Sequence, residues 1–175
     1  HGVVLLQYLD SAGNVLQSFD SPWLTNGAAN NTWSSYEASG FAPVGTVSGR
    51  TLCAIIGKDS TFAGNVFFDD MSQRVVQVSD TVSGLLHNVG FDDGPSGNAY
   101  NLDATTNFPY WKWLGGTNAG FVTTSYQRDG SQSLAITFPS NLAAQTAVAK
   151  TGCVYILEGY MSSPVNQKLS NSAYG

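Results

Sequence analysis

The chain carries the same acidic motif twice, as Phe68-Asp69-Asp70 and as Phe91-Asp92-Asp93. Aspartate oxygens are ligands that Ca²⁺ accepts readily, because this cation takes six to eight oxygen atoms. Carboxylates that lie close together repel each other unless a cation separates them. The repeated motif therefore indicates either a cation site or ordinary aspartates in turns, and both interpretations stay open from the residues alone.

Aromatic residues form a second group that suits a particular chemistry, the binding of neutral sugars. Flat rings stack on the apolar faces of pyranose rings, while amide groups bond the hydroxyls. Packing inside the protein explains any single ring equally well, and exposed rings also anchor protein–protein contacts. The candidates for sugar binding lie in or beside stretches rich in Asn and Gly, and they are Trp23, Trp33, Tyr100, Tyr110 and Trp113.

Residues for catalysis are poorly represented. A glycoside hydrolase needs two carboxyl groups that face each other across a cleft, but Glu37 and Glu158, the only glutamates, lie in strand-like runs. His1 and His87 accompany no nucleophile motif such as Gly-x-Ser-x-Gly. The sequence also lacks a His-Glu-x-x-His motif, a phosphate-binding loop and a Cys/His zinc pattern. We therefore expect no catalytic residues and no enzyme activity.

The two cysteines, Cys53 and Cys153, lie in the apolar runs TLCAIIG and GCVYILEGYM. In an extracellular protein they would form a disulfide. Closing a loop of about 100 residues in this way would stabilise the fold by roughly 4–5 kcal/mol in the chain-entropy model. The alternative is two buried thiols, which are common in protein cores. We expect the disulfide.

Short strands must position all of these residues. GVVLLQYLD and VLQSF, joined by a Gly-Asn turn, predict a β-hairpin. Further runs with period-2 or continuous apolar patterns are separated by turns rich in Gly, Asn, Ser and Pro. They are TWSSYEASGFAP, TVSGRTLCAIIG, NVFFDDMSQRVVQV, GFVTTSYQ, QSLAITFP, AQTAVAK and CVYILEGYM. About ten short strands with regular turns predict an all-β sandwich or barrel.

Length and composition restrict the partners. A chain of 175 residues fits one domain with a good core. Charged residues make up 11% and the net charge is -5, so the seven Lys and Arg residues do not form a track for nucleic acid or anionic membranes. The apolar runs are strand-sized, which excludes a membrane-spanning helix.

Two halves of the sequence resemble the jelly-roll carbohydrate-binding modules attached to bacterial xylanases and glucanases. Residues 86–164 resemble the opening half of that family, through NVGFDDG, the tryptophans of PYWKW, the small-residue turn of RDGSQSLAI and the strand entry of KTGCVYILEGYMSS. Residues 2–73 resemble the closing half, through VLLQYLDSAGNVL, NTWSSYEASGFAPVGTVSGRTLCAII and GNVFFDDMS. The closing half thus precedes the opening half, with residues 77–88 as the junction. Three explanations of this rotated order stay open. The chain is one repeat of a tandem array that is cut in mid-module, it is a circular permutation, or each chain exchanges one half with a neighbouring chain.

The resemblance implies a structural calcium ion and adds roles for particular residues. In that family an acidic residue of the opening motif, a backbone carbonyl near the small-residue turn and an aspartate of the terminal strand bind this ion. Carried onto this sequence, the metal ligands are Asp92, the region of Asp129, and Asp69 or Asp70. Trp111 aligns with a tryptophan of the family that belongs mostly to the core, so we expect it to be structural.

We therefore expect one antiparallel jelly-roll β-sandwich over residues 1–175, in which 1–78 is the closing half and 86–175 the opening half. The expected function is a non-catalytic, secreted or cell-surface module that binds neutral polysaccharide, with Ca²⁺ as structural cofactor. It is also expected to contact copies of itself as tandem or polymeric neighbours. The alternative is a structural repeat of an extracellular fibre or adhesin that does not bind sugar. Fold alone does not decide between them.

Overall fold

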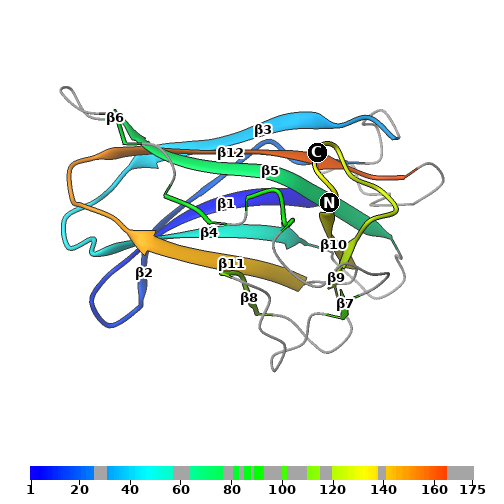
Figure 1. Cartoon of the computed structure of the whole chain (residues 1–175). Helices are drawn as coiled ribbons and strands as arrows, with labels where there is room; N and C mark the ends of the chain where they lie inside the picture. The colour runs from blue at the N-terminus through cyan, green and yellow to red at the C-terminus, as the bar shows by residue number, and fades with distance from the viewer. Residues whose placement is uncertain are drawn as a thin grey trace, which may run out of the picture.

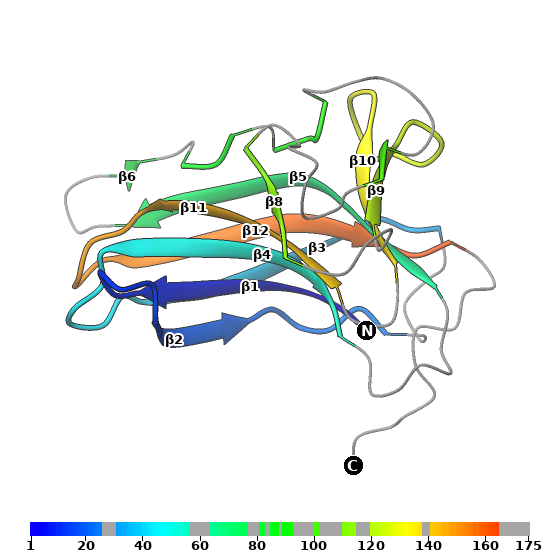
Figure 2. The same cartoon turned by 90° about the horizontal axis from the view of Figure 1, so that it is seen from below.

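The computed structural model describes residues 1–25, 31–56, 64–76, 81–82, 85–87, 89–92, 100–101, 110–114, 120–137 and 141–164. These residues form twelve strands and no helix, arranged as two antiparallel sheets packed face to face (Figures 1 and 2). The predicted all-β sandwich is therefore confirmed. Among the described residues there is no helix that is long and apolar enough to cross a membrane.

The first sheet has the strand order β2-β1-β4-β11-β8. It consists of β1 (Gly2–Leu9), β2 (Val15–Asp20), β4 (Ser48–Ile55), β8 (Lys112–Trp113) and β11 (Asn141–Val148). The second sheet has the order β3-β12-β5-β10-β9-β7, with β6 paired to β5 at one side. It consists of β3 (Ser34–Phe41), β5 (Asn65–Val76), β6 (Thr81–Val82), β7 (Tyr100–Asn101), β9 (Gly120–Thr123), β10 (Ser133–Thr137) and β12 (Val154–Ser162).

The predicted hairpin is formed by β1 and β2. The Asp10 carboxylate closes its turn by accepting hydrogen bonds from the amides of Ala12 (2.8 Å) and Asn14 (2.9 Å). Gly13 takes the positive φ of 85° that this turn requires, a conformation that glycine adopts without a steric penalty. The Gly-Asn signal in the sequence thus has a direct structural cause.

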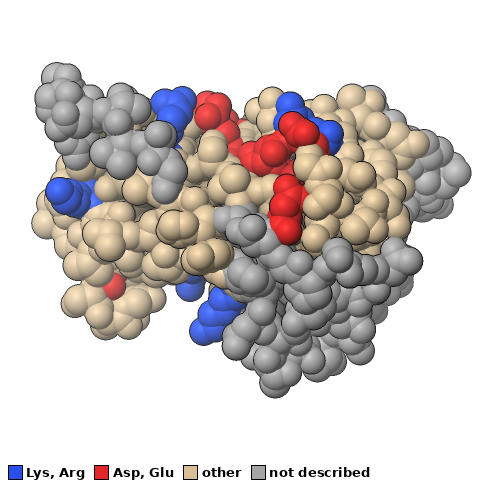
Figure 3. All heavy atoms as spheres, in the orientation of Figure 1, with Lys and Arg blue, Asp and Glu red and all other residues tan. Residues whose placement is uncertain are grey.

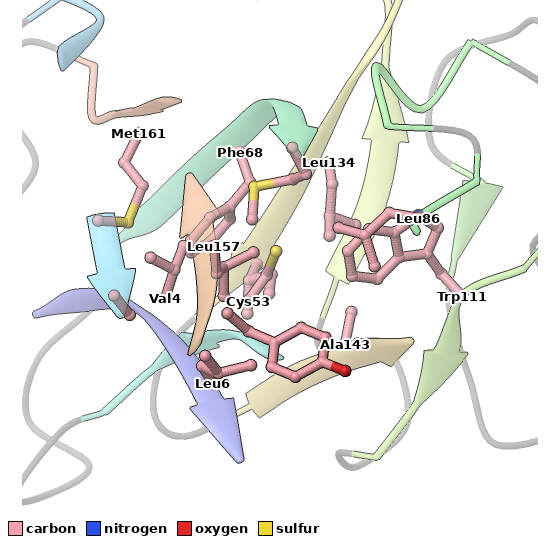
Figure 4. Close-up of a cluster of buried hydrophobic side chains, with 14 of the residues drawn as sticks. Val4, Leu6, Cys53, Phe68, Leu86, Trp111, Leu134, Ala143, Leu157 and Met161 are labelled. Carbon is pink, nitrogen blue, oxygen red and sulfur yellow. The ribbon is translucent and has the colours of Figure 1, made fainter. Parts of the chain in front are cut away.

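Alternate residues of the strands point inward and fill the space between the sheets. Side chains of β1, β4 and β11 meet those of β5, β10 and β12 there, as Figure 4 shows for Val4, Leu6, Phe68, Leu134 and Leu157. All five have no solvent exposure. Burial of such side chains contributes about 1.5–3 kcal/mol each to folding, which makes this apolar layer the main source of stability.

Both sheets combine strands from the two halves of the sequence. In the first sheet β4 pairs with β11 along its full length, from Ile55 opposite Asn141 to Ser48 opposite Val148. In the second sheet β5 lies between β10 and β12. Part of the predicted junction also belongs to this body, because β6 pairs with β5 and Leu86 is buried in the core. The two halves therefore pair within one chain in this structure.

The predicted disulfide between Cys53 and Cys153 is wrong, because both residues are buried thiols in separate places. Cys53 lies on β4 opposite Val4, whereas the Cys153 thiol interacts with the hydroxyl of Tyr155, whose ring contacts that of Tyr8. Tyr8 and Val4 are four residues apart on β1, which is about 13 Å along an extended strand. A disulfide requires Cα atoms within about 7 Å. Burial raises the pKa of the Cys53 thiol, so this side chain acts as a small apolar residue.

Candidate functional site

Asp69, from the first acidic motif, lies on β5 and has no solvent exposure. Its Oδ1 accepts a hydrogen bond from the Asp70 amide (2.9 Å). Its Oδ2 accepts from the amides of Arg128 (2.9 Å) and Asp129 (3.4 Å), which open the turn between β9 and β10. A buried carboxylate is thereby held by backbone donors, and these contacts fix the turn against the sheet.

The neighbouring Asp70 has a different partner and lies where β5 is irregular. Asp70 has a positive φ of 48°, and the pairing of β5 with β12 shifts register between Glu158 and Tyr160. Such a bulge adds one residue to a strand, and the core-facing residues of β5 accordingly change from Phe68 before it to Met71 after it. The Asp70 carboxylate forms an ion pair with the Arg128 guanidinium, which also lies 3.6 Å from the centre of the Tyr160 ring. The ion pair raises the pKa of Arg128.

Asp92, from the second acidic motif, holds the other side of the same turn. Its Oδ1 accepts hydrogen bonds from the Ser131 amide (2.7 Å), the Ser131 hydroxyl (2.9 Å) and the Gln132 amide (2.9 Å). Gly130, with a φ of 64°, allows this approach, since a Cβ at this position would collide with the Asp92 carboxylate. We call Asp69, Asp92 and the turn 128–132 that they bind the carboxylate clasp.

The two aspartates from opposite ends of the predicted module are therefore brought together, as the resemblance implies. A Cβ placed on Gly90 would lie 3.1 Å from Asp92 Oδ2 and 3.8 Å from Asp69 Oδ1, so both oxygens face one small space. Acidic side chains gather over this part of the molecule in Figure 3, beside basic side chains. Among the residues described here, Asp69 is the only acidic residue that is buried.

The fit of the clasp to Ca²⁺ is partial. Both oxygens of Asp69 and Oδ1 of Asp92 accept amide hydrogen bonds, which leaves Asp92 Oδ2 as the oxygen of these two carboxylates with no amide bond among those described. Asp70 is paired with Arg128, and the Asp129 carboxylate accepts the Gly130 amide (2.8 Å). In the described part of the chain no three His, Cys, Asp or Glu residues form a group that could hold a metal ion.

Burial controls the charge of Asp69. Loss of hydration raises the pKa of its carboxyl group to about 6, and the nearby Asp70 charge acts in the same direction. The amide hydrogen bonds from Arg128 and Asp70 oppose this shift but do not cancel it. The Asp69 carboxyl group therefore takes up a proton at a higher pH than an aspartate in water.

Among the aromatic candidates whose side chains are described, Tyr110 is the most exposed at 62%. It has a positive φ of 70°, which is rare for a large side chain, and its ring stacks on His87 with centroids 4.8 Å apart. The buried side-chain amide of Gln145 forms two hydrogen bonds with the backbone of His87. Its Oε1 accepts from the His87 amide (2.7 Å), and its Nε2 donates to the His87 carbonyl (2.9 Å). The adjacent Trp111 is buried against Phe91, as predicted for a structural residue.

We call Tyr110 and His87 the aromatic platform. The buried Gln145 fixes one member, and the buried Trp111 anchors the backbone of the other. The exposed Tyr110 ring thus stacks on another exposed side chain, His87, whose backbone is held by a buried group. Strained backbone of this kind persists where the surroundings determine it, and it is often found at binding sites.

Two further candidates are also stacked. Trp33 is half-buried and lies 5.4 Å from the ring of Tyr126, which contacts Phe67 and shares a hydrogen bond of 2.7 Å with the Ser162 hydroxyl. Trp23 lies flat on the His1 ring at 3.8 Å and is 45% exposed. Trp23, Trp33 and Tyr110 thus stack on three different partners, which are His1, Tyr126 and His87. The side chains of Tyr100 and Trp113 lie outside the described residues, as does Asp93.

Several residues of these sites escaped the sequence analysis. His87 and Gln145, which position Tyr110, come from the predicted junction and from the strand AQTAVAK, and no motif connects them. Arg128 directly precedes the Asp-Gly turn, so its closeness to a carboxylate was detectable, whereas its stacking on Tyr160 was not.

Comparisons of this chain with protein-family models, with curated proteins and with solved structures find no match. The likeness to carbohydrate-binding modules therefore rests on the quoted motifs alone.

Proposed function

We propose that this chain is a non-catalytic, extracellular β-sandwich module that binds neutral polysaccharide. The observation that supports the proposal best is the aromatic platform. Tyr110 is exposed, its backbone is held at a φ of 70° and its orientation is fixed by His87. A ring fixed before binding loses little conformational entropy when a sugar stacks on it. The low charge of the chain suits an uncharged ligand.

Affinity electrophoresis in soluble glucans, xylans and mannans tests this proposal. The native protein is expected to migrate more slowly in at least one of these glycans, and Tyr110→Ala should weaken the retardation at least tenfold. Phe41→Ala is the matched control, because Phe41 is an aromatic residue with 56% exposure on the other sheet. Sugar binding would be refuted by normal migration in every glycan, and the platform by equal retardation of Tyr110→Ala.

Calcium is a second part of the proposal and concerns the carboxylate clasp. The ion would be held by Asp92 Oδ2 and Asp69 Oδ1, which face the same space. Bound there, it would neutralise the two carboxylates and join segments from both halves of the chain. Because a ligand specific for the folded state raises stability, millimolar Ca²⁺ should raise the melting temperature and a chelator should lower it. Asp92→Asn should abolish the difference. Equal melting temperatures of the native protein with Ca²⁺ and with chelator would refute the site.

The alternative function, a structural repeat of a fibre or adhesin, is favoured by one specific observation. Exposed aliphatic side chains gather at the end of the sandwich formed by the β1–β2, β3–β4 and β11–β12 loops. This surface is independent of sugar binding, and a module can have both properties.

A further inference from the structure

Part of the outer face of the second sheet is covered by another layer of the protein. In the strand register, Phe67 on β5 is opposite both Ala135 on β10 and Ser162 on β12. The neighbouring residues on two of these strands, Phe68 and Leu134, face the core, so this row faces away from it. Nevertheless Phe67 is only 6% exposed, and Ala135 and Ser162 have no solvent exposure.

Tyr126, from the loop between β9 and β10, lies over this row. Its ring meets the Phe67 ring edge to face, with the ring centres 4.8 Å apart. Its hydroxyl shares a hydrogen bond of 2.7 Å with the Ser162 hydroxyl, and its backbone carbonyl accepts one from the hydroxyl of the buried Ser133. Groups on β5, β10 and β12 therefore fix the position of this ring.

Trp33 continues this stack of rings. It directly precedes β3, and its ring lies nearly parallel to that of Tyr126, at 22° and with the ring centres 5.4 Å apart. Both rings are partly exposed, whereas the Phe67 ring is buried. Trp33 and Tyr126, which we call the Trp33–Tyr126 stack, therefore present an aromatic surface to solvent that rests on the second sheet.

The backbone that carries the stack is also held in place. The Asn31 amide donates to the Ser163 carbonyl at the end of β12 (2.9 Å), which ties the segment before the tryptophan to the sheet. In the other segment, the Asp69 carboxylate accepts a hydrogen bond from the Arg128 amide (2.9 Å), two residues beyond Tyr126. A ligand that binds the stack therefore has little backbone to order.

The side chains next to the stack are polar and uncharged. Hydroxyl or amide groups belong to each of the exposed neighbours Thr32, Ser34, Thr124, Ser125 and Gln127. The first charged residue that follows in the loop, Arg128, is neutralised by its ion pair with Asp70. Aromatic rings bordered by such groups suit a neutral sugar, whose apolar face stacks on a ring and whose hydroxyls need hydrogen-bonding partners.

The Trp33–Tyr126 stack is separate from the aromatic platform. His87 of the platform is bonded to Gln145 on β11, in the first sheet. Tyr126 rests instead on Phe67 of β5, in the second sheet. The two stacks share no residue and are anchored in different sheets, so they are two points of contact for a ligand.

We propose that the Trp33–Tyr126 stack is a second sugar-binding site, which holds a pyranose ring of the same class of neutral polysaccharide as the platform. This inference rests on the proposed function. When one site is occupied by a long polysaccharide, the second meets its ligand at a high effective concentration. The module should therefore bind the polysaccharide on the order of 100-fold more tightly than a short oligosaccharide of the same sugar.

¹⁹F NMR of the protein labelled with 5-fluorotryptophan tests the site directly, with cellohexaose, xylohexaose and mannohexaose as probes. The Trp33 resonance is identified by its loss in Trp33→Tyr. It is expected to shift during titration with the hexaose whose polysaccharide retards the native protein in electrophoresis. The resonance of the buried Trp111 is the internal control and should not move. A stationary Trp33 resonance, with retardation that depends on Tyr110, would overturn this site and leave the platform.

Affinity electrophoresis of variants is the second test. Trp33→Ala should weaken retardation at least fivefold, Trp33→Tyr should restore most of it because it retains a flat ring, and Phe41→Ala at the far end of β3 is the control. The double variant Trp33→Ala/Tyr110→Ala should bind more weakly than Tyr110→Ala alone. Equal binding by these last two proteins would overturn the second site, and normal migration of the native protein in every glycan would refute both sites.

Discussion

The carboxylate clasp and the aromatic platform solve opposite physical problems. In the clasp, the charged Asp69 is buried and its oxygens bond to backbone amides, so its chemistry is directed inward. In the platform, the buried Gln145 supports an exposed ring, so its chemistry is directed outward. In both regions a buried polar side chain holds a neighbouring segment in place. Changes in the clasp should therefore affect mainly the stability of the fold, and changes in the platform should affect mainly ligand binding.

The largest effect on stability is expected beneath the platform, at two adjacent residues. Trp111→Ala empties a buried site and should lower the free energy of unfolding by about 3–5 kcal/mol. Tyr110→Ala removes an exposed ring and should change it by less than about 0.5 kcal/mol, while it weakens glycan binding. Urea denaturation of both variants measures the difference. A large loss in Tyr110→Ala would mean that this ring is structural.

The next largest effect is expected at the clasp. Asp69→Ala leaves the amides of Asp70 and Arg128 without their acceptor. Each unsatisfied buried group costs about 1–3 kcal/mol. Because the variant no longer buries a charge, part of this cost is offset, and the free energy of unfolding should fall by about 2–4 kcal/mol. Asp129→Ala is the control, because that exposed carboxylate accepts only the amide of the next residue among the bonds described. Chemical denaturation that gives equal losses for both variants would contradict this role of Asp69.

The dependence of stability on pH sharpens the comparison. The folded-state pKa of Asp69, about 6, lies above the value of about 3.9 expected in the unfolded chain. Between these values the folded protein binds more protons, so the contribution of Asp69 to stability is greatest below about pH 4. It decreases as the pH rises to about 6, by up to roughly 3 kcal/mol.

Denaturation curves from pH 4 to 7 for the native protein and for Asp69→Asn measure this contribution as the difference between the two proteins. A difference that is constant over this range would contradict the raised pKa. Ca²⁺ bound at the clasp would lower the pKa of Asp69, so its stabilising effect should be larger at pH 7 than at pH 5.

The smallest effect is expected from reducing agents. Because Cys53 and Cys153 are distant thiols, dithiothreitol should leave the melting temperature of the native protein unchanged within about 1 °C. Alkylation of the unfolded, unreduced protein should modify both cysteines, as mass spectrometry would show. If neither cysteine is alkylated, the two residues are joined by a disulfide, as the sequence analysis predicted.

The sequence predicted those features that depend on local patterns. Alternation of apolar residues and turn residues predicted the sandwich and the β1–β2 hairpin, while the resemblance to a family predicted that Trp111 is structural. The sequence did not predict features that depend on how far along a strand a residue lies. Periodicity placed both cysteines in the core but did not reveal that they lie in separate parts of it, Cys53 opposite Val4 on β1 and Cys153 next to Tyr155.

Contacts between distant segments escaped prediction for a similar reason. The bond of Gln145 to His87 joins residues that are 58 positions apart, and it involves a side-chain amide with many potential partners. The bulge at Asp70 depends on the register of β5 against β12, which no single strand encodes. The resemblance to a family supplied the closeness of Asp69 and Asp92, which the residues alone left open.

The pairing of early with late strands in both sheets has a consequence for how the protein forms. Neither β4 nor β5 has its full set of neighbours until β10, β11 and β12 have been synthesised. Contacts between residues so far apart in sequence require closure of long loops, and such topologies fold slowly. On the ribosome, the first half must wait with its apolar strand faces uncovered, a state that is prone to aggregation. The same interdependence predicts that two polypeptides divided between β6 and β7 would remain unstructured alone and recover the sandwich when mixed.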